Sequence, residues 1–181
     1  MIIALSGKYR SGKDTTALFI QEEFQKRGIY FEIKSFADKL KYIVLILCGL
    51  DKSYYDQKEH YVPFFNMTLG QMYQKVGTEC LRNNLDPDVW IKALFVDYTP
   101  DQNWIISDCR FQNEANFIKT TDNSYVIRVN RTLNYDVGSR DINHKSEIDL
   151  DYYDFDQIIE NDGDLLNLKY KCSMIVNDIL C

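Results

Sequence analysis

The sequence has few of the residues that build metal centres and disulfide frameworks. It contains two histidines, His60 and His144, which are too few for a histidine-built metal site. Its five cysteines are scattered, odd in number and without paired spacing, so we expect free thiols in a reducing compartment. No apolar run approaches the roughly 18 residues of a membrane-spanning helix. The first residues resemble a strand, so no signal peptide is expected and the predicted location is cytoplasmic.

Positive charge is also scarce. The chain has 21 lysines and arginines against 27 acidic residues, which gives a formal net charge of −6. This balance disfavours nucleic-acid binding through a basic surface, so any site for an anion must be local. Internal repeats, low-complexity tracts and linkers are absent as well. A chain of 181 residues therefore predicts about one domain with a single substantial core.

The most informative stretch lies at the start of the chain. Residues 2–5 form an apolar run, predicted to be a buried parallel strand, and Gly7, four further residues, Gly12 and Lys13 follow. This is the spacing of a phosphate-binding loop, whose glycines let backbone N–H groups point at phosphate oxygens. The next helix adds the positive end of its dipole, and Lys13 would reach the β- and γ-phosphates of a nucleotide. An ordinary glycine turn is the alternative, but the order of strand, loop and amphipathic helix favours phosphate binding.

One position departs from the motif. The residue after the lysine should be Ser or Thr, which ligates magnesium, and here it is Asp14. A carboxylate in the first turn of a helix suits the helix dipole, and it could also hold the metal through a water molecule. Both interpretations of Asp14 stay open.

Apolar periodicity predicts an alternation of strands and helices after the loop. Helices are expected over 15–27, 38–48, 69–81, 111–119 and 165–180 and from Pro87 onward, and strands over 30–36, 104–107, 125–129 and 155–159. Residues 51–66 lack a clear period, so we expect a long mobile surface loop there. The alternation predicts an α/β fold with a five-stranded parallel sheet and helices on both faces.

Several candidate ligand-binding residues lie at or just past predicted strand ends: Phe36, Asp108 and Arg131. Because ligands of parallel sheets bind at the carboxyl ends of the strands, these residues should converge with the phosphate-binding loop at one rim. Asp108 would hold a water on a magnesium ion, and Arg110 would contact the phosphoryl group in transfer. The alternative is that Asp108 caps the next helix.

In two predicted helices, some residues could either bind a ligand or have a purely structural role. Arg82 can grip a phosphate through paired hydrogen bonds, but Glu79 lies three residues earlier, and spacing alone favours an exposed ion pair. Trp90 and Tyr73 could stack on a nucleobase, although both fall on the apolar sides of amphipathic helices, where core positions are favoured.

The polar stretch over residues 130–150 contains Arg131, Arg140 and His144. It suits a lid that closes over phosphates and expels water, or else a solvated loop. Phosphoryl transfer requires aligned substrates and cations more than covalent chemistry, and these arginines supply cations in an acidic chain. A phosphate acceptor needs no strong base, since its second pKa is about 6.

Five segments together resemble a known family. They are Gly7–Asp14 with its Gly-Lys-Asp, Ser35-Phe36-Ala37-Asp38 with Leu40-Lys41, Gly77-Thr78-Glu79 with Arg82 and Trp90, Asp108–Glu114 followed by 126–131, and His144-Lys145-Ser146-Glu147. Through them the chain resembles the deoxynucleoside monophosphate kinases of bacteriophages and large DNA viruses, within the P-loop nucleoside monophosphate kinase superfamily. Each segment is a modest signal, but their number and order make the resemblance specific.

The resemblance implies an enzyme that transfers the γ-phosphate of ATP, with Mg²⁺, to a deoxynucleoside monophosphate and yields the diphosphate. It implies a three-layer P-loop sandwich with a core of residues 1–37, 99–130 and 151–181, an acceptor-binding helical insert over 38–98 and a lid over 131–150. The expected partners are ATP and the deoxynucleoside monophosphate, without nucleic acid or membrane, in the host cytoplasm if the source is viral. A homodimer stays open.

The resemblance also assigns roles to matched residues. The ATP-binding set is Gly7, Lys8, Arg10, Ser11, Gly12, Lys13, Asp14, Thr15 and Arg131. The acceptor-binding set is Phe36, Asp38, Lys41, Tyr73, Gln74, Arg82, Trp90 and Arg110. The catalytic set is Lys13, Asp108, Arg110 and Arg140, and Asp14 and Asp108 are expected to hold the metal through water.

Two alternatives compete with this interpretation. Animal-type phosphomevalonate kinases share Gly-Lys-Asp and an ending similar to residues 154–163, but the segments around Gly77–Trp90 and Arg110–Glu114 look more like the nucleotide enzymes. A non-catalytic nucleotide-binding module is the second alternative. The absence of an Asn-Lys-X-Asp motif disfavours a guanine-nucleotide switch, and the retained arginines disfavour an inactive module.

Overall fold

The computed structural model of the chain describes residues 1–131 and 145–181. The chain forms two compact units, one of residues Met1–Ser35 and Thr99–Cys181 and the other of residues Phe36–Tyr98. Arg140 and His144, which were predicted to belong to the lid, lie outside the described residues, as does most of that segment. Within the described ranges, no helix has both the length and the apolar character needed to cross a membrane.

The first unit is built on a five-stranded sheet. Its strands are β1 (Ile2–Ser6), β2 (Glu32–Lys34), β5 (Trp104–Cys109), β6 (Ser124–Asn130) and β7 (Gln157–Glu160), in the order β2-β5-β1-β6-β7. Every pairing is parallel, and β1 lies in the middle with Ile3 opposite Ile105 on one side and Tyr125 on the other. The predicted α/β class with a parallel five-stranded sheet is therefore confirmed.

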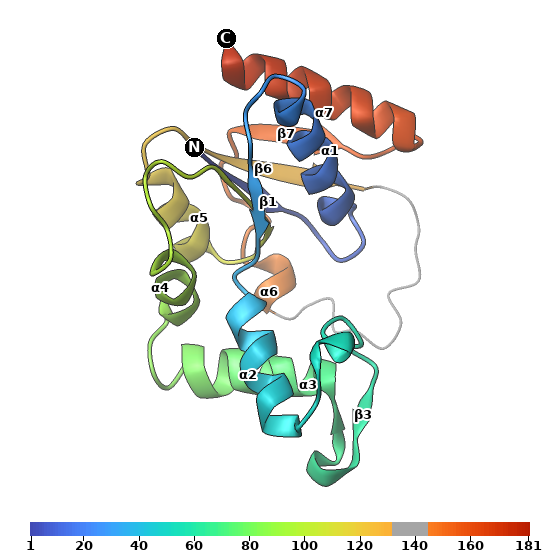
Figure 1. Cartoon of the computed structure of the whole chain (residues 1–181), viewed down its shortest axis with the longest axis vertical. Helices are drawn as coiled ribbons and strands as arrows, with labels where there is room; N and C mark the ends of the chain where they lie inside the picture. The colour runs from blue at the N-terminus through green and yellow to red at the C-terminus, as the bar shows by residue number, and fades with distance from the viewer. Residues whose placement is uncertain (132–144) are drawn as a thin grey trace. The chain divides into compact units, whose positions relative to one another are not determined.

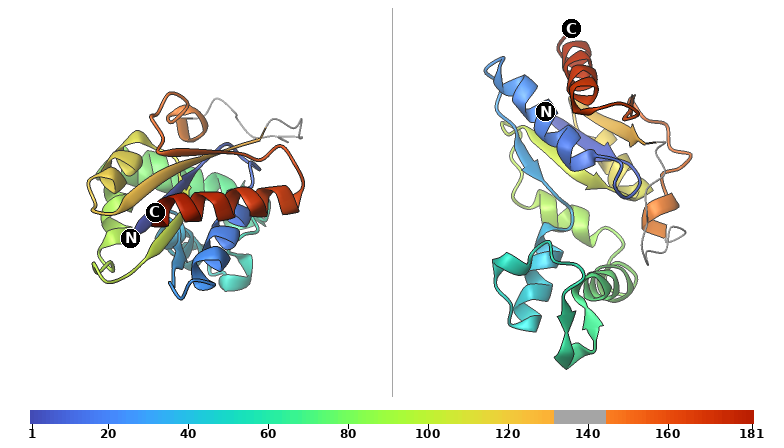
Figure 2. Two further views of the ribbon diagram at one scale, coloured as in Figure 1. Left: turned by 90° about the horizontal axis from the view of Figure 1, so that it is seen from above. Right: turned by 90° about the vertical axis from the view of Figure 1, so that its right-hand side faces the viewer.

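Helices cover both faces of this sheet. Helices α1 (Lys13–Gln25) and α7 (Leu165–Leu180) pack against each other on one face, and α5 (Gln112–Lys119) lies on the other (Figures 1 and 2). The core beneath α1 and α7 consists of apolar side chains from both layers: Ile3, Leu5, Ala17, Ile20, Phe24, Phe31, Ile105, Ile127, Ile159, Leu168, Cys172, Ile175 and Val176. Burial of each large aliphatic side chain contributes about 1.5–3 kcal/mol, so this layer fixes the frame that carries the strand ends.

The second unit is mainly helical. It contains α2 (Asp38–Cys48), α3 (Leu69–Gln74), a wider π-type helix η3 (Lys75–Arg82) that continues α3, and α4 (Val89–Phe95). A capping box starts α3, because the Thr68 hydroxyl accepts from the Gln71 N–H and the Gln71 side chain accepts in return. Gly77 lets η3 lie close to α2, since a Cβ there would come within 2.6 Å of Leu40.

The prediction of a long loop over residues 51–66 was wrong. This segment contains two short 3₁₀ helices, η1 (Lys52–Tyr54) and η2 (Pro63–Phe65), and the strand β3 (Tyr61–Val62), which pairs antiparallel with β4 (Met67–Thr68). Asn66 makes the turn between the strands with a φ of 52°. Strands of two residues are too short to produce an alternating apolar pattern, so periodicity could not detect them.

Several helices and strands begin or end at other residues than the sequence predicted. The strand expected over 30–36 is only β2 (Glu32–Lys34), an edge strand that pairs with β5 alone. Helix α1 starts two residues earlier than expected, because Gly12 in the left-handed conformation ends the loop and lets Lys13 begin the helix. A short helix, α6 (Lys145–Ile148), lies within the segment predicted as a lid.

Candidate active site

The carboxyl ends of the parallel strands bring distant residues to one edge of the first unit. The phosphate-binding loop follows β1, Ser35 follows β2, and Asp108 lies at the end of β5. The Ser35 hydroxyl donates to Asp108 Oδ2 at 2.6 Å, although the two residues are 73 positions apart. Asn161, directly after β7, donates through Nδ2 to the Ser11 carbonyl of the loop at 2.8 Å. The strand-end residues thus surround the loop.

The loop conformation depends on its glycines. Gly12 has a φ of 98°, and a Cβ there would lie 2.4 Å from the Asn161 amide nitrogen. A Cβ at Gly7 would lie 2.4 Å from the Val129 carbonyl oxygen. Gly12 is also the N-cap of α1 and supplies no side-chain cap, so the first N–H groups of the helix face the loop. The loop therefore has the backbone geometry of an anion cradle.

Lys13 is the central cation of this loop. Its Nζ donates to the carbonyl oxygens of Gly7 and Lys8, each at 2.8 Å, and the residue is only 8% exposed. Burial, together with the positive charge of Arg110, lowers the pKa of Lys13 to about 7, while the carboxylates of Glu147, Asp14 and Asp108 oppose that shift. Charges from distant parts of the sequence, at Asp108, Arg110 and Glu147, therefore act on the same amine as the neighbouring Asp14.

Arg110 is held at both its backbone and its side chain. Glu114, in the first turn of α5, accepts the backbone N–H groups of Arg110 and Phe111 through Oε2. At the other end, Arg110 Nη1 donates to Glu147 Oε1 at 2.6 Å and to the Ser146 carbonyl at 3.3 Å. The guanidinium is thereby fixed beside the loop.

Glu147 was absent from the predicted site. Its second carboxylate oxygen, Oε2, accepts the backbone N–H of Tyr9 in the loop at 3.0 Å, and its side chain is 4% exposed. No periodic pattern marks this residue, because it lies in a polar stretch. The only signal in the sequence was its place in the His144–Glu147 segment that resembles the family.

A second network supports the base of the loop. Arg128 on β6 is buried and donates to the Ser6 hydroxyl at 3.2 Å and to Asp151 at 3.2 Å. Lys8 pairs with the same carboxylate at 2.6 Å. Arg128 and Asp151 were also missed, since an arginine inside an apolar strand carries no motif of its own.

The acidic residues fit magnesium bound through substrate and water. Asp14 is exposed on the first turn of α1, and Asp108 is oriented by Ser35. Among residues 1–131 and 145–181 there is no group of three or more His, Cys, Asp or Glu side chains placed to hold a metal. Mg²⁺ in phosphoryl-transfer sites is commonly held by one or two carboxylates plus phosphates and water, so this donor set fits that ion.

The other predicted ATP-binding residues have varied positions. Ser11 and Thr15 lie in the loop and the first turn of α1, whereas Arg10 is exposed with its guanidinium 5.3 Å from the Tyr9 ring centroid. Arg131 is exposed just past the end of β6.

In the second unit, Tyr55 lies in a small cluster of polar side chains. The Tyr55 hydroxyl donates to Asp38, and the Tyr73 hydroxyl donates to the Tyr55 carbonyl at 3.3 Å. Lys41 lies 4.1 Å from the Tyr55 ring centroid and pairs with Asp56 at 2.8 Å. Burial and the Asp38 carboxylate raise the pKa of Tyr55. Asp38, Lys41 and Tyr73 were predicted, and Tyr55 was not.

The remaining predicted acceptor residues of this unit are spread along it. Phe36 and Trp90 are buried, and the Trp90 indole N–H donates to the Gly77 carbonyl at 2.9 Å. Arg82 Nη1 donates to the Pro87 carbonyl at 3.1 Å. The indole contact ties α4 to η3, so Trp90 packs this unit, and its role near the base stays a prediction.

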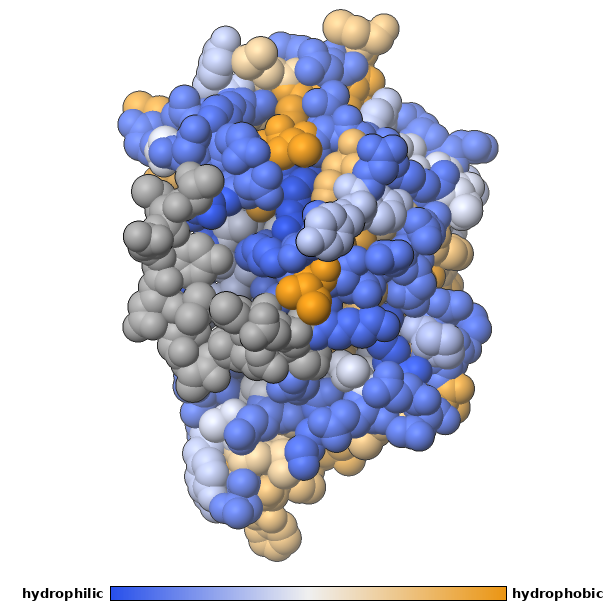
Figure 3. Space-filling model, turned by 180° about the vertical axis from the view of Figure 1, so that it is seen from behind, coloured by the Kyte–Doolittle hydropathy of each residue, from blue (hydrophilic) through white to orange (hydrophobic). Residues whose placement is uncertain are grey.

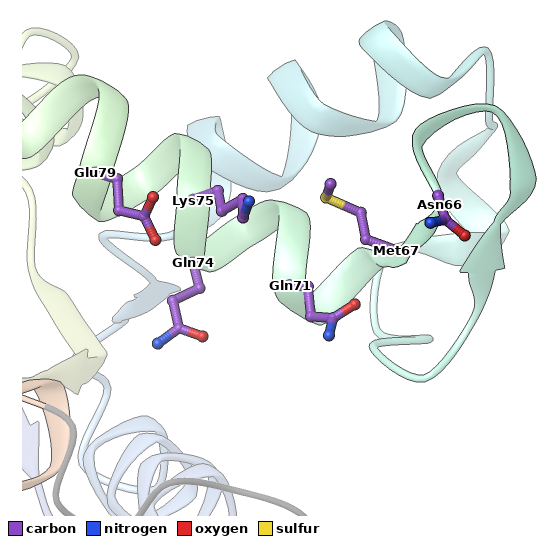
Figure 4. Close-up of a pocket in the computed structure, with 6 residues that line it drawn as sticks. All are labelled: Asn66, Met67, Gln71, Gln74, Lys75 and Glu79. Carbon is purple, nitrogen blue, oxygen red and sulfur yellow. The ribbon is translucent and has the colours of Figure 1, made fainter.

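Gln74 lines a cavity of about 380 Å³ in the second unit. The other lining residues are Asn66, Met67, Gln71, Lys75 and Glu79. Figure 4 shows that Gln71 and Gln74 project from the same side of α3. The cavity is thus lined by three amide side chains and by one charge of each sign.

A phosphate-binding loop after the middle strand of a parallel sheet, with an acid and an arginine at the end of the neighbouring strand, defines an α/β fold of the P-loop kinase type. The deoxynucleotide monophosphate kinase family matches residues 49–172 of this chain. A protein of Acanthamoeba polyphaga mimivirus, provisionally named a deoxynucleotide monophosphate kinase, is 33% identical over 169 residues, which cover 83% of this chain and 82% of the relative. The chain belongs to the deoxynucleotide monophosphate kinase family and is a phosphotransferase that acts on a deoxynucleoside monophosphate. The phosphomevalonate kinase and non-catalytic alternatives find no support in these comparisons.

Proposed function

We propose that the chain transfers the γ-phosphate of ATP, in the presence of Mg²⁺, to a deoxynucleoside monophosphate and releases ADP and the deoxynucleoside diphosphate. The observation that carries the proposal is Lys13, a buried amine at the start of α1 with a pKa lowered to about 7 and with Arg110 close enough to contribute to that shift. Two cations gathered beside a backbone cradle suit an anionic ligand such as a phosphate. Family membership supplies the acceptor class.

The loop would hold the donor phosphates. Backbone N–H groups of residues 7–13 and the α1 dipole would bind the β- and γ-phosphates, with Ser11, Thr15 and Arg131 beside them. Lys13 would exchange its two carbonyl acceptors, at 2.8 Å each, for phosphate oxygens. The negative charge of the triphosphate would favour the ammonium form and raise the pKa of Lys13 back toward its ordinary value.

The carboxylates would position the metal. Asp108, oriented by Ser35, and Asp14 would each accept from a water in the coordination shell of the ion. The bound ion would supply positive charge that offsets the charge of the donor phosphates.

Arg110 would stabilise charge on the phosphoryl group in transfer and grip the acceptor phosphate. Guanidinium and phosphate pair through two parallel hydrogen bonds, which fixes direction as well as distance. No protein base is required, because an acceptor phosphate with a second pKa of about 6 is largely ionised at neutral pH. Arg140 is proposed to join this group from the lid over residues 131–150.

The second unit would bind the acceptor, as the insert of a core formed by residues 1–37, 99–130 and 151–181. Arg82 and Lys41 would bind phosphate oxygens, and Asp38 and Tyr73 would line the sugar. Gln74 would pair with the base edge from the cavity shown in Figure 4, because an amide offers both a donor and an acceptor. Phe36 and Trp90 would form the apolar wall.

The partner predictions extend this proposal. On the face shown in Figure 3, apolar side chains gather in small separate groups among polar ones. With a net charge of −6, this surface supports small anionic substrates bound locally in preference to a nucleic acid. A homodimer stays a prediction, to be checked by sedimentation.

A coupled assay tests the proposal directly. ADP formation is measured with ATP and Mg²⁺ and each of the four deoxynucleoside monophosphates, with phosphomevalonate as a comparison. We expect turnover of at least one nucleotide, and loss of about 10³-fold in kcat for Lys13→Ala with the fold retained. Lys169→Ala is the matched control, since Lys169 pairs with Glu22 on the helical face at 2.7 Å. Turnover of phosphomevalonate alone, or an active and folded Lys13→Ala protein, would contradict the proposal.

A further inference from the structure

The carboxylate of Glu147 connects two parts of the site that are far apart in sequence. Oε1 accepts from Arg110 Nη1 at 2.6 Å, and Oε2 accepts from the backbone N–H of Tyr9 at 3.0 Å. One contact reaches the arginine that follows β5, and the other reaches the first half of the phosphate-binding loop. Each oxygen of a single side chain therefore serves a different element.

This contact lies in a protected environment. The Glu147 side chain is 4% exposed and that of Arg110 is 21% exposed. A buried carboxylate must be paired, and removal of its partner leaves a costly uncompensated charge. Water also competes weakly for such a pair, so the geometry of the pair is well defined compared with a surface ion pair.

The contact uses only one nitrogen of the guanidinium. Among the described residues, Arg110 makes its side-chain hydrogen bonds through Nη1, to Glu147 and to the Ser146 carbonyl. The edge formed by Nε and Nη2 has no hydrogen-bond partner in that part of the chain. This edge has the fork geometry that matches two phosphate oxygens.

We propose that Glu147 is a positioning residue for phosphoryl transfer, which holds the guanidinium of Arg110 in register with the phosphate-binding loop. The inference rests on the proposed role of Arg110 at the transferred phosphate. Glu147 acts through the Nη1 contact and through the Tyr9 N–H, and does not touch the substrates. Since the loop holds the donor and Arg110 holds the group in transfer, one carboxylate sets the distance between the two.

Loss of a Glu147 contact should slow turnover, because Arg110 would no longer be aligned with the phosphate-binding loop. A displacement of about 1 Å in a catalytic group can reduce turnover about 10²-fold without loss of binding. In Glu147→Gln, the amide NH₂ must face either Arg110 or the Tyr9 N–H, and both of these are donors. One contact is therefore lost while the size of the side chain is kept. We expect kcat to fall about 10²-fold with the Kd for ATP nearly unchanged.

The experiment compares Glu147→Gln and Glu147→Asp with Asp149→Asn. Asp149 is a matched control, because it accepts from the Gln112 N–H at 2.8 Å and makes no contact with the loop. Circular dichroism checks the fold, calorimetry gives the Kd for ATP, and the coupled assay gives kcat and KM. The shorter Asp side chain cannot reach both partners, so Glu147→Asp should also lose kcat and provides the test if the Gln variant does not fold.

A double-mutant cycle separates positioning from a general structural effect. In an Arg110→Met background, Glu147→Gln should reduce kcat little further, because the group that Glu147 positions is already gone. The same second change should raise the melting temperature of Arg110→Met, since it removes a buried negative charge that has lost the guanidinium opposite it. Independent, additive losses in kcat would contradict the inference.

The outcomes distinguish this inference from the proposed function. If the wild type turns over and the Glu147 variants have the same kcat as Asp149→Asn, the inference is overturned and the proposed function is left intact. Tighter ATP binding with unchanged kcat makes Glu147 a competitor of the donor phosphates and also overturns it. A wild-type protein without turnover on all four nucleotides overturns the proposed function, and the inference falls with it.

Discussion

The rim of the first unit and the cavity region of the second unit are built in different ways. At the rim, backbone N–H groups and strand ends supply the geometry, and the charged side chains of Lys13, Arg110 and Glu147 are mostly buried. In the second unit, the candidate ligands are side chains on short helices, and Gln71, Gln74 and Glu79 are exposed. Under the proposed function, the transfer chemistry common to every substrate would take place on a rigid sheet edge. The contacts that select the acceptor would lie on elements that are easier to vary.

The two regions also differ in the energetic cost of their charges. Lys13 is buried and loses hydration, so its positive charge works against the stability of the fold. Lys41 and Lys92 in the second unit pair with Asp56 and Asp86, carboxylates that are either exposed or only partly buried. Such exposed ion pairs change the free energy of unfolding little.

The largest expected effect concerns Lys13 and pH. Its folded pKa of about 7 lies below its unfolded value near 10.5, so the burial penalty is complete below pH 7 and declines as the pH rises toward 10.5. Without nucleotide, Lys13→Met should therefore be more stable than the wild type at pH 6, by on the order of 4 kcal/mol. The margin should shrink by pH 9.

Urea unfolding at pH 6, 7.5 and 9 measures that margin. Lys169→Met serves as the control, because Lys169 lies on α7, is partly exposed and pairs with Glu22 on α1. A margin that is flat with pH would show that burial does not perturb Lys13 as stated, and the contrast between the two regions would be lost.

The next effect concerns the loop backbone. Gly12→Ala places a Cβ 2.4 Å from the Asn161 amide nitrogen at a φ of 98°. We expect a loss of about 1–3 kcal/mol in the free energy of unfolding and weaker ATP binding. Gly28→Ala is a matched control, because Gly28 also has a positive φ, of 76°, but has no neighbour within 4 Å. Equal losses in ATP affinity for both variants would argue against a role of loop shape.

The success of the sequence-based predictions also differs between the two units, and within the first unit it depends on whether a signal is local in the sequence. The motif identified Gly7, Gly12 and Lys13, and the rule that ligands bind at strand ends pointed to Asp108 and Arg110, because both signals are local in sequence. Contacts such as Glu147 with the Tyr9 N–H and Asn161 with the Ser11 carbonyl are made by isolated polar side chains across more than a hundred residues. No local pattern encodes such contacts.

In the second unit, local signals were weaker still. The β3–β4 hairpin has strands of two residues each, so its alternation could not be seen. Tyr55 lies in the segment predicted as a mobile loop, yet its hydroxyl donates to Asp38 and its carbonyl accepts from Tyr73. The helices themselves were predicted well, since their apolar faces are long enough to show a period.

A smaller effect should appear in selectivity. Gln74→Ala removes an amide from the cavity, and we expect the ratio of kcat/KM among the four deoxynucleoside monophosphates to change about tenfold, which is about 1.4 kcal/mol. Gln57→Ala is the control, because Gln57 is an exposed glutamine of the same unit whose amide donates to the Ser53 carbonyl. Competition assays with paired nucleotides measure the ratio. A uniform fall for all four substrates would place Gln74 outside base recognition.

The smallest effect on turnover is expected from a change in the packing of the second unit. Trp90→Phe removes the indole donor to the Gly77 carbonyl, which is made at 2.9 Å. We expect a loss of about 1–3 kcal/mol in stability, with kcat at saturating acceptor within about twofold of the wild type. Thermal unfolding and the coupled assay measure both. A large drop in kcat with unchanged stability would instead place the indole at the nucleotide.

The central position of β1 has a consequence for synthesis on the ribosome. Its residues are translated before those of its neighbours, because Ile3 pairs with Ile105 and Tyr125, about a hundred residues further along the chain. The nascent chain must therefore keep an apolar strand unpaired until β5 and β6 have left the exit tunnel, a period in which chaperones bind such segments. The loop after β1 can acquire its shape only then, so catalytic competence arises after β5 and β6 are made, although the loop motif is translated before them.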